Sequence, residues 1–189
     1  MIFKEMAIKG AWKVQSNLHN DERGLFFEWF KNQELKKSTG LDFKPVQGNS
    51  SVSKKGVIRG IHYSLAKPGQ DKWVTCLAGS VWDVIVDLRV GSPTFKQWIG
   101  LELSENSGIS VVIESGLGHG FLSLKDNSVL NYLLTSEYDK NLEKEVNVFD
   151  SELNIKWNST TSFLSQKDIE AKSLEEMRCA ELLPIFDRD

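Results

Sequence analysis

Residues 56–87 hold two runs in which apolar residues alternate with polar ones, a pattern typical of β-strands. The first run reads Gly-Val-Ile-Arg-Gly-Ile-His-Tyr (56–63), and the second reads Gly-Ser-Val-Trp-Asp-Val-Ile-Val-Asp (79–87). A polar side chain within a strand either faces solvent or is paired inside the protein. An arginine, a histidine and two aspartates on adjacent strands therefore predict a polar pocket inside a β structure.

The rest of the chain continues as a series of short strands. We predict roughly eight to ten strands, because turn signals recur about every 8–12 residues, as they do in sandwiches and barrels. We also predict a short helix over 31–37, ended at Thr39-Gly40, and a second helix that begins at Ser165 and runs to about Met177. The apolar segment 182–186 is expected to dock on the body of the protein.

Length and composition narrow the class of protein. A chain of 189 residues is expected to form one domain, and a net charge of −3 does not predict a nucleic-acid-binding surface. No apolar run is long enough to cross a bilayer, and the first residues lack the basic-then-apolar order of a signal peptide. Cys76 and Cys179 form no disulfide framework, so we expect free thiols and a cytoplasmic protein.

The sequence has three histidines, of which two are candidates for chemistry. His19 lies in a polar segment and is expected to be exposed and inert. His62 and His119 lie in glycine-rich strand contexts, where a purely structural histidine is the common alternative. A metal site is disfavoured because His62 has no second histidine two residues away and no cysteine pair is present. A hydrolase serine and a phosphate-binding glycine loop are disfavoured because 115–120 lacks their flanking patterns.

General acid/base chemistry fits the remaining residues best. A neutral His62 could act as a base near pH 7 if a carboxylate oriented it, and Asp168 and Asp83 are both candidates for that carboxylate. Lys72 could stabilise developing negative charge. The candidates for a proton donor on the opposite face are Tyr132 and Tyr138.

Several motifs resemble a single known family. They read Asp-Glu-Arg-Gly-Leu-Phe-Phe-Glu (21–28), Gln-Gly-Asn-Ser-Ser (47–51), Gly-Val-Ile-Arg-Gly-Ile-His-Tyr (56–63), Gln-Asp-Lys (70–72), Gly-Ser-Val-Trp-Asp-Val-Ile-Val-Asp-Leu-Arg (79–89), Gly-Ser-Pro-Thr-Phe (91–95) and Gly-His-Gly-Phe (118–121). In this combination they resemble dTDP-4-dehydrorhamnose 3,5-epimerase and related dTDP-sugar epimerases, over about residues 3–170.

The resemblance implies an all-β, cupin-type jelly-roll barrel with short flanking helices. It implies one domain over 1–189, with a helical tail from about 165 that packs on the barrel, and a homodimer that needs no metal or organic cofactor. The implied substrate is a thymidine-diphospho-4-keto-6-deoxyhexose, which is inverted at C3 and C5 through an enolate.

The same resemblance implies roles for individual residues. His62 is the base that removes a proton beside the C4 ketone, Asp168 orients it, Lys72 stabilises the enolate oxygen, and Tyr132 is the acid on the opposite face. The implied substrate-binding residues are Arg23 and Arg59 at the diphosphate, Phe26, Glu28, Gln47 and Asn49 at the nucleotide and sugar, and Tyr138, His119, Glu143 and Lys167. We also expect Asp83 to pair with His119 as a second buried dyad.

The chain departs from the family pattern at a few positions. Ser64 stands where many relatives carry Gln, Val-Asn-Val-Phe-Asp (146–150) replaces an aromatic-Asn-Asp ending, and Asn158 follows Trp157 in place of Pro. These changes leave the acid/base residues intact but leave the sugar specificity open. The alternatives are a C3-only epimerase or ketoisomerase, a non-catalytic sugar-nucleotide-binding cupin, and a metal-dependent cupin.

Overall fold

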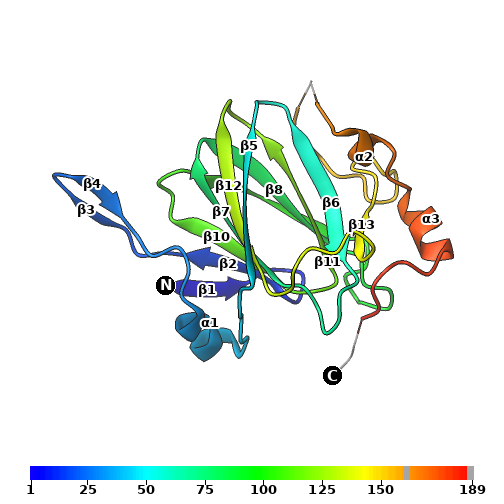
Figure 1. Ribbon diagram of the computed structural model, residues 1–189, viewed down its shortest axis with the longest axis horizontal. Helices are drawn as coiled ribbons and strands as arrows, with labels where there is room; N and C mark the ends of the chain where they lie inside the picture. The colour runs from blue at the N-terminus through cyan, green and yellow to red at the C-terminus, as the bar shows by residue number, and fades with distance from the viewer. Residues whose placement is uncertain (160–161, 187–189) are drawn as a thin grey trace.

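Two antiparallel β-sheets face each other in the computed structural model, which describes residues 1–159 and 162–186 (Figure 1). The larger sheet has the strand order β1 (Ile2–Glu5), β2 (Ala11–Gln15), β10 (Ile109–Ile113), β7 (Lys72–Ala78), β12 (Ser128–Leu134) and β5 (Gln47–Ser53). The smaller sheet has the order β13 (Glu143–Glu145), β6 (Ile58–Ser64), β11 (Leu117–Ser123), β8 (Ser80–Asp87) and β9 (Trp98–Ser104). A separate hairpin of β3 (His19–Asp21) and β4 (Gly24–Phe26) projects away from the two sheets.

The described residues form thirteen strands, more than the eight to ten that the turn spacing predicts. The difference lies in β1, β3 and β13, which are only three or four residues long. A strand this short shows too little alternation to be recognised in the sequence.

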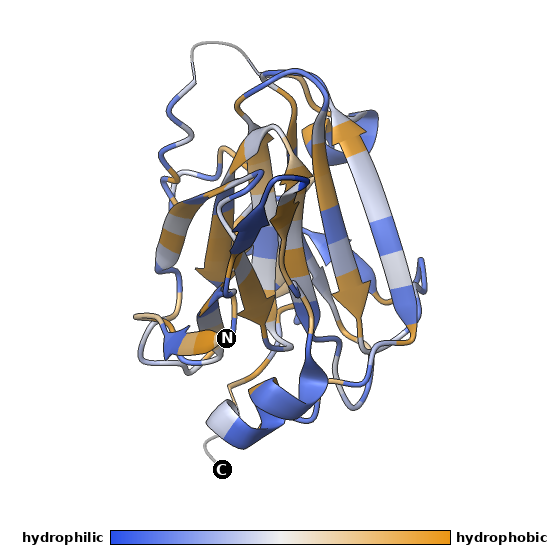
Figure 2. Ribbon diagram, turned by 90° about the vertical axis from the view of Figure 1, so that its left-hand side faces the viewer, coloured by the Kyte–Doolittle hydropathy of each residue, from blue (hydrophilic) through white to orange (hydrophobic). Residues whose placement is uncertain are grey.

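Both faces of the central strands are buried, and this explains their apolar sequences. On β7, Val74 and Cys76 pack between the two sheets, whereas Trp73 packs on the opposite face against Phe30. The outer face of the smaller sheet is covered by apolar residues of the C-terminal segment. Figure 2 shows the apolar residues concentrated on these central strands. Almost every residue of β8 is consequently buried, which its near-continuous apolar run requires.

The first predicted helix is confirmed. It is α1 (Asn32–Thr39), and it ends at Gly40, whose φ of 85° is a left-handed conformation that glycine adopts without strain. No described helix has the length and apolar composition needed to cross a membrane.

The prediction of a single helix from Ser165 to about Met177 is wrong, because two short helices occupy that segment. They are α2 (Gln166–Ile169), capped by Ser165, and α3 (Leu174–Cys179), capped by Ser173. The Ser173 hydroxyl accepts a hydrogen bond from the backbone N–H of Glu176. The carboxylate of Glu176 in turn accepts a hydrogen bond from the backbone N–H of Ser173. A complete capping box of this kind starts a new helix, so the first one stops short of it.

The apolar tail docks on the body, as predicted. Leu183 is buried, and Ile185 forms an isolated β-bridge with Val90. Residues 187–189 of the predicted tail lie outside the described residues.

A close approach of two glycines sets the geometry between β6 and β11. A Cβ atom on Gly60 would lie 2.6 Å from the Cα of Gly120, so neither strand tolerates a side chain there. The register shifts next to this contact, between His119 and Phe121. As a result His62 and His119 lie directly opposite each other on neighbouring strands, which places both imidazoles at one spot inside the barrel.

Candidate active site

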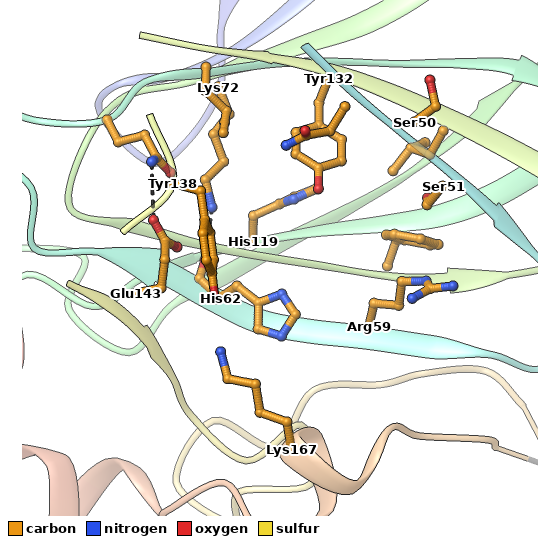
Figure 3. A pocket seen from close by; sticks show the side chains of 15 residues that line it. Ser50, Ser51, Arg59, His62, Lys72, His119, Tyr132, Tyr138, Glu143 and Lys167 are labelled. Atoms are coloured by element: carbon orange, nitrogen blue, oxygen red, sulfur yellow. Dashed lines mark hydrogen bonds between the residues drawn. The ribbon is translucent and has the colours of Figure 1, made fainter. Parts of the chain in front are cut away.

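A cavity of about 350 Å³ opens between the two sheets, within the size range of small-ligand sites (Figure 3). Its lining combines charged, amide and aromatic side chains from both sheets and from the loops at the mouth. The lining residues are Asn49, Ser50, Ser51, Arg59, His62, Gln70, Lys72, His119, Phe121, Leu130, Tyr132, Leu134, Tyr138, Glu143 and Lys167.

His62 and Asp168 form a hydrogen-bonded dyad at the wall made by the smaller sheet. Nε2 of His62 lies 2.7 Å from Oδ1 of Asp168, and the Ser165 hydroxyl donates to Oδ2 of the same carboxylate at 2.8 Å. Burial acts to raise the pKa of Asp168, but the hydrogen bonds from His62 and Ser165 and the charge of Lys167 outweigh it, so the pKa lies below its ordinary value. Asp168 is therefore a carboxylate that accepts the His62 Nε2–H, which leaves Nδ1 free to accept a proton.

Lys72 enters the cavity from β7 of the larger sheet. Its Nζ donates a hydrogen bond to the backbone carbonyl of His62 at 3.2 Å, so the ammonium lies close to the dyad. Burial lowers the pKa of Lys72, and the nearby Glu143 carboxylate offsets part of this effect. The amide of Gln70 donates to Glu143 at 3.1 Å and holds that carboxylate in place.

Tyr132 lies on β12, in the sheet opposite the one that carries His62. Burial raises the pKa of its phenol, and a hydrogen bond with Asn49 offsets part of that shift. The phenol thus keeps its proton at neutral pH and can donate it. A base on one wall and an acid on the other can act on opposite faces of a molecule held between them.

The predicted second dyad is present on β11, the strand next to β6, and on β8. Nε2 of His119 lies 2.7 Å from Oδ2 of Asp83, and the exposed fraction of the Asp83 side chain is 0%. His19, in contrast, is exposed on the projecting hairpin, as predicted.

Polar groups also surround the mouth of the cavity. Lys167 pairs with Glu145 at 2.8 Å, and Nε of Arg59 donates to Ser53 at 3.2 Å. Gln47 lies just outside the lining but connects two of its members. Its Nε2 donates to Asn49 Oδ1 at 3.0 Å, and its Oε1 accepts from the backbone N–H of Tyr138 at 2.8 Å.

Three predicted binding residues lie away from this cavity. Arg23 belongs to the β3–β4 hairpin, where its guanidinium pairs with Asp21 and its side chain is 89% exposed. Phe26 on the same hairpin is 67% exposed, and Glu28 follows it and pairs with Lys31. The structure therefore does not bring these residues together with His62 in one chain.

Some lining residues were missed in the sequence. Ser51 could have been found from the period of two that begins at Asn49 on β5, because alternate residues share a face. Gln70 lies in a motif that the sequence makes conspicuous, yet no pattern indicates that its amide holds Glu143. Leu130 and Phe121 give no signal that separates a pocket wall from ordinary core.

Among the described residues, no group of three or more His, Cys, Asp and Glu side chains is placed to hold a metal ion.

Known proteins are similar to this chain in sequence and in fold. The family model described as dTDP-4-dehydrorhamnose 3,5-epimerase matches residues 5–176. The chain belongs to this family. The dTDP-4-dehydrorhamnose 3,5-epimerase of Mycolicibacterium smegmatis is 42% identical over 98% of this chain and 92% of its own length. The dTDP-4-dehydrorhamnose 3-epimerase of Streptomyces niveus is 41% identical over 98% of this chain and 90% of its own.

Solved structures agree with this membership. A 4-keto-6-deoxy sugar epimerase from the novobiocin gene cluster of Streptomyces spheroides superposes with a TM-score of 0.96, at 41% identity over 98% of this chain and 94% of that chain. The predicted cupin-type jelly roll is confirmed, and the chain is an isomerase-class enzyme of the epimerase family. Family members of two specificities resemble it almost equally.

Replacing Asp168 by Asn is expected to destabilise the protein in a pH-dependent way. The folded-state pKa of Asp168 lies below the ordinary value of 3.8, so its ionised form adds stability above that pH, and this stability is lost as the pH falls through the folded-state value. The loss of unfolding free energy in Asp168→Asn should be greatest above about pH 5 and shrink below about pH 4. Urea denaturation at a series of pH values measures it. A loss that stayed constant into acid would contradict the assignment.

Proposed function

We propose that this protein inverts C3 and C5 of a dTDP-4-keto-6-deoxyhexose by removing and returning protons. The observation that carries the proposal is the cavity in which His62 on one sheet, hydrogen-bonded to Asp168, faces Tyr132 on the other sheet, with the buried Lys72 side chain lining the same cavity. Membership of the epimerase family supports the choice of substrate.

The reaction follows from the positions of these groups. The C4 ketone acidifies the neighbouring C–H bond, and Nδ1 of His62 takes that proton while the electron pair moves onto the C4 oxygen. Lys72 stabilises the resulting enolate, because a fixed cation in a buried site interacts strongly with developing charge. The electron pair then returns to the carbon, which takes a proton from the Tyr132 hydroxyl on the opposite face, and the configuration inverts.

Other lining residues would hold the rest of the substrate. The Arg59 guanidinium suits the diphosphate, since its planar fork matches phosphate oxygens. Tyr138 is 58% exposed at the mouth and offers an aromatic face to the thymine ring of the nucleotide. Binding contacts with the sugar or nucleotide are proposed for Gln47, Asn49, His119, Glu143 and Lys167.

A C3-only epimerase is the second candidate, because a relative named as a 3-epimerase is about as similar to this chain as a 3,5-epimerase is. Both activities use the same base and the same enolate. They differ in whether the sugar ring can turn so that a second carbon reaches His62 and Tyr132.

Exchange in heavy water tests the proposal and separates the two candidates. The purified protein with dTDP-4-keto-6-deoxyglucose in heavy water should incorporate deuterium at both C3 and C5, read by NMR. Incorporation at C3 alone would establish the C3-only enzyme. Binding without any exchange would overturn the proposal in favour of a non-catalytic binding protein.

His62→Ala is expected to lower turnover by about 10²–10⁴, the contribution of a positioned base, while the fold remains intact. Lys37→Ala is the control, because that side chain is exposed on α1, which contributes no residue to the cavity lining, and it should leave turnover unchanged. Steady-state kinetics with circular dichroism of both variants decides the matter. Equal activities of the two variants would remove His62 from the mechanism.

Lys72→Met keeps the length of the side chain and removes its charge. If Lys72 stabilises the enolate, kcat should fall much more than the affinity for dTDP, because the lost interaction is formed only in the transition state. Turnover assays and calorimetric titration with dTDP compare the two effects. A variant that only bound more weakly would reassign Lys72 to substrate binding.

We further propose a homodimer in which the β3–β4 hairpin of one copy reaches the cavity of the other. The support is that Arg23 and Phe26 are highly exposed and far from the cavity of their own chain, and that an isolated two-stranded hairpin is marginal in water.

Mixing two inactive variants tests this arrangement. Arg23→Ala and His62→Ala, unfolded together and refolded, should regain part of the wild-type turnover, because mixed dimers then contain one intact site. Each variant refolded alone is the control. Failure to regain activity, with dimers confirmed by sedimentation, would place the hairpin in its own site.

The remaining expectations stay predictions. A cytoplasmic location is supported by the free Cys76 and Cys179 thiols. Independence of a metal or organic cofactor follows from the acid/base mechanism proposed above.

A further inference from the structure

The two histidine dyads lie side by side but in different surroundings. His62 and His119 are opposite each other in the β6–β11 pairing, and both line the cavity (Figure 3). In each ring Nε2 is bound to a buried aspartate at 2.7 Å, Asp168 in one case and Asp83 in the other. In both rings Nδ1 is therefore the nitrogen left for a substrate.

The second carboxylate oxygen distinguishes the two aspartates. Oδ2 of Asp168 accepts a hydrogen bond from Ser165, and this bond stabilises the negative charge of the carboxylate. Oδ1 of Asp83 is buried and receives no hydrogen bond from any residue in the described part of the chain. Asp83 lies on β8 between Val81 and Ile85, both in the apolar cluster between the sheets.

A net negative charge is costly in such surroundings, so the Asp83–His119 pair must be close to neutral as a whole. Two proton arrangements achieve this: an imidazolium facing a carboxylate, or a protonated carboxyl donating to Nε2 of a neutral ring. In both, Nδ1 of His119 carries a proton. The arrangement that leaves Nδ1 bare places an unneutralised carboxylate among apolar side chains.

We infer that His119 presents a proton-bearing Nδ1 to the sugar, and that Asp83 is the positioning residue that keeps it so. The inference rests on the proposed function and deepens it. His62 is 37% exposed and has the better-supported aspartate, so its Nδ1 accepts a proton, whereas His119 is 11% exposed and donates. The two rings thus have different roles. His62 removes a proton from a C–H bond, and His119 donates a hydrogen bond to a sugar oxygen.

Nitrogen NMR of the protein with ¹⁵N-labelled histidine tests the proton position directly. The His119 signals are assigned by their loss in His119→Gln, and spectra are recorded for the free protein and with dTDP bound. We expect Nδ1 of His119 to carry a proton in both. A proton on Nε2 alone would overturn the inference. The measurement needs no turnover, so it remains decisive even if the proposed epimerase activity fails.

Kinetics tests whether Asp83 acts through His119. Asp83→Leu should lower turnover by about 10²-fold, the effect of losing one oriented donor. The same change in a His119→Gln background should cost less than about threefold, because the ring it positions is already gone. An equal loss in both backgrounds would overturn the positioning role.

Controls separate this effect from a general loss of stability. Thr75→Val alters another buried polar group, on a β7 position that alternates away from the cavity residue Lys72, and it should leave turnover unchanged. If Asp83→Leu does not fold, Asp83→Asn replaces it in the same double-mutant comparison, with the same two outcomes.

Discussion

The architecture depends on giving a partner to each of the charged groups that bring the site's chemistry between the two apolar sheets. An unpaired polar or charged group in such a place is costly, whereas a paired one is tolerated. Asp168, Lys72 and Glu143 each meet this requirement through a partner on a different element. The same pairs that make burial possible also fix the orientation of the groups that would carry out the chemistry.

This constraint explains why the C-terminal segment belongs to the site. Asp168 is delivered by α2, a helix of four residues that would not be stable alone. Ser165 caps that helix and also bonds the carboxylate, and Phe163 forms a β-bridge with Val57 just before it. The tail is therefore held by the barrel, and the barrel's own histidine is oriented by the tail.

The sequence was sufficient for the strands and for much of the site, because both follow from local patterns. The alternation over 56–63 and 79–87 reflects residues that face the cavity or the core, and β6 and β8 carry them as expected. Partners such as His62 and Asp168 are 106 residues apart, and no spacing rule brings them together, so only the family resemblance indicated the pair. Arg23 was predicted with the site because its motif is characteristic of the family, whereas the structure places it on the exposed β3–β4 hairpin, away from the cavity of its own chain.

The buried lysine shows how stability and activity are opposed in this fold. Burying an ammonium between two sheets costs free energy, and Glu143 returns only part of it. A cation that is already desolvated and fixed, however, needs no reorganisation when an enolate forms beside it. The Gln70 amide, which holds Glu143 at 3.1 Å, then matters indirectly, because it sets how strongly that carboxylate competes with the enolate for Lys72. Burial lowers the pKa of Lys72 and the Glu143 carboxylate opposes that shift, so this carboxylate favours the charged form of the lysine for which we propose the enolate-stabilising role.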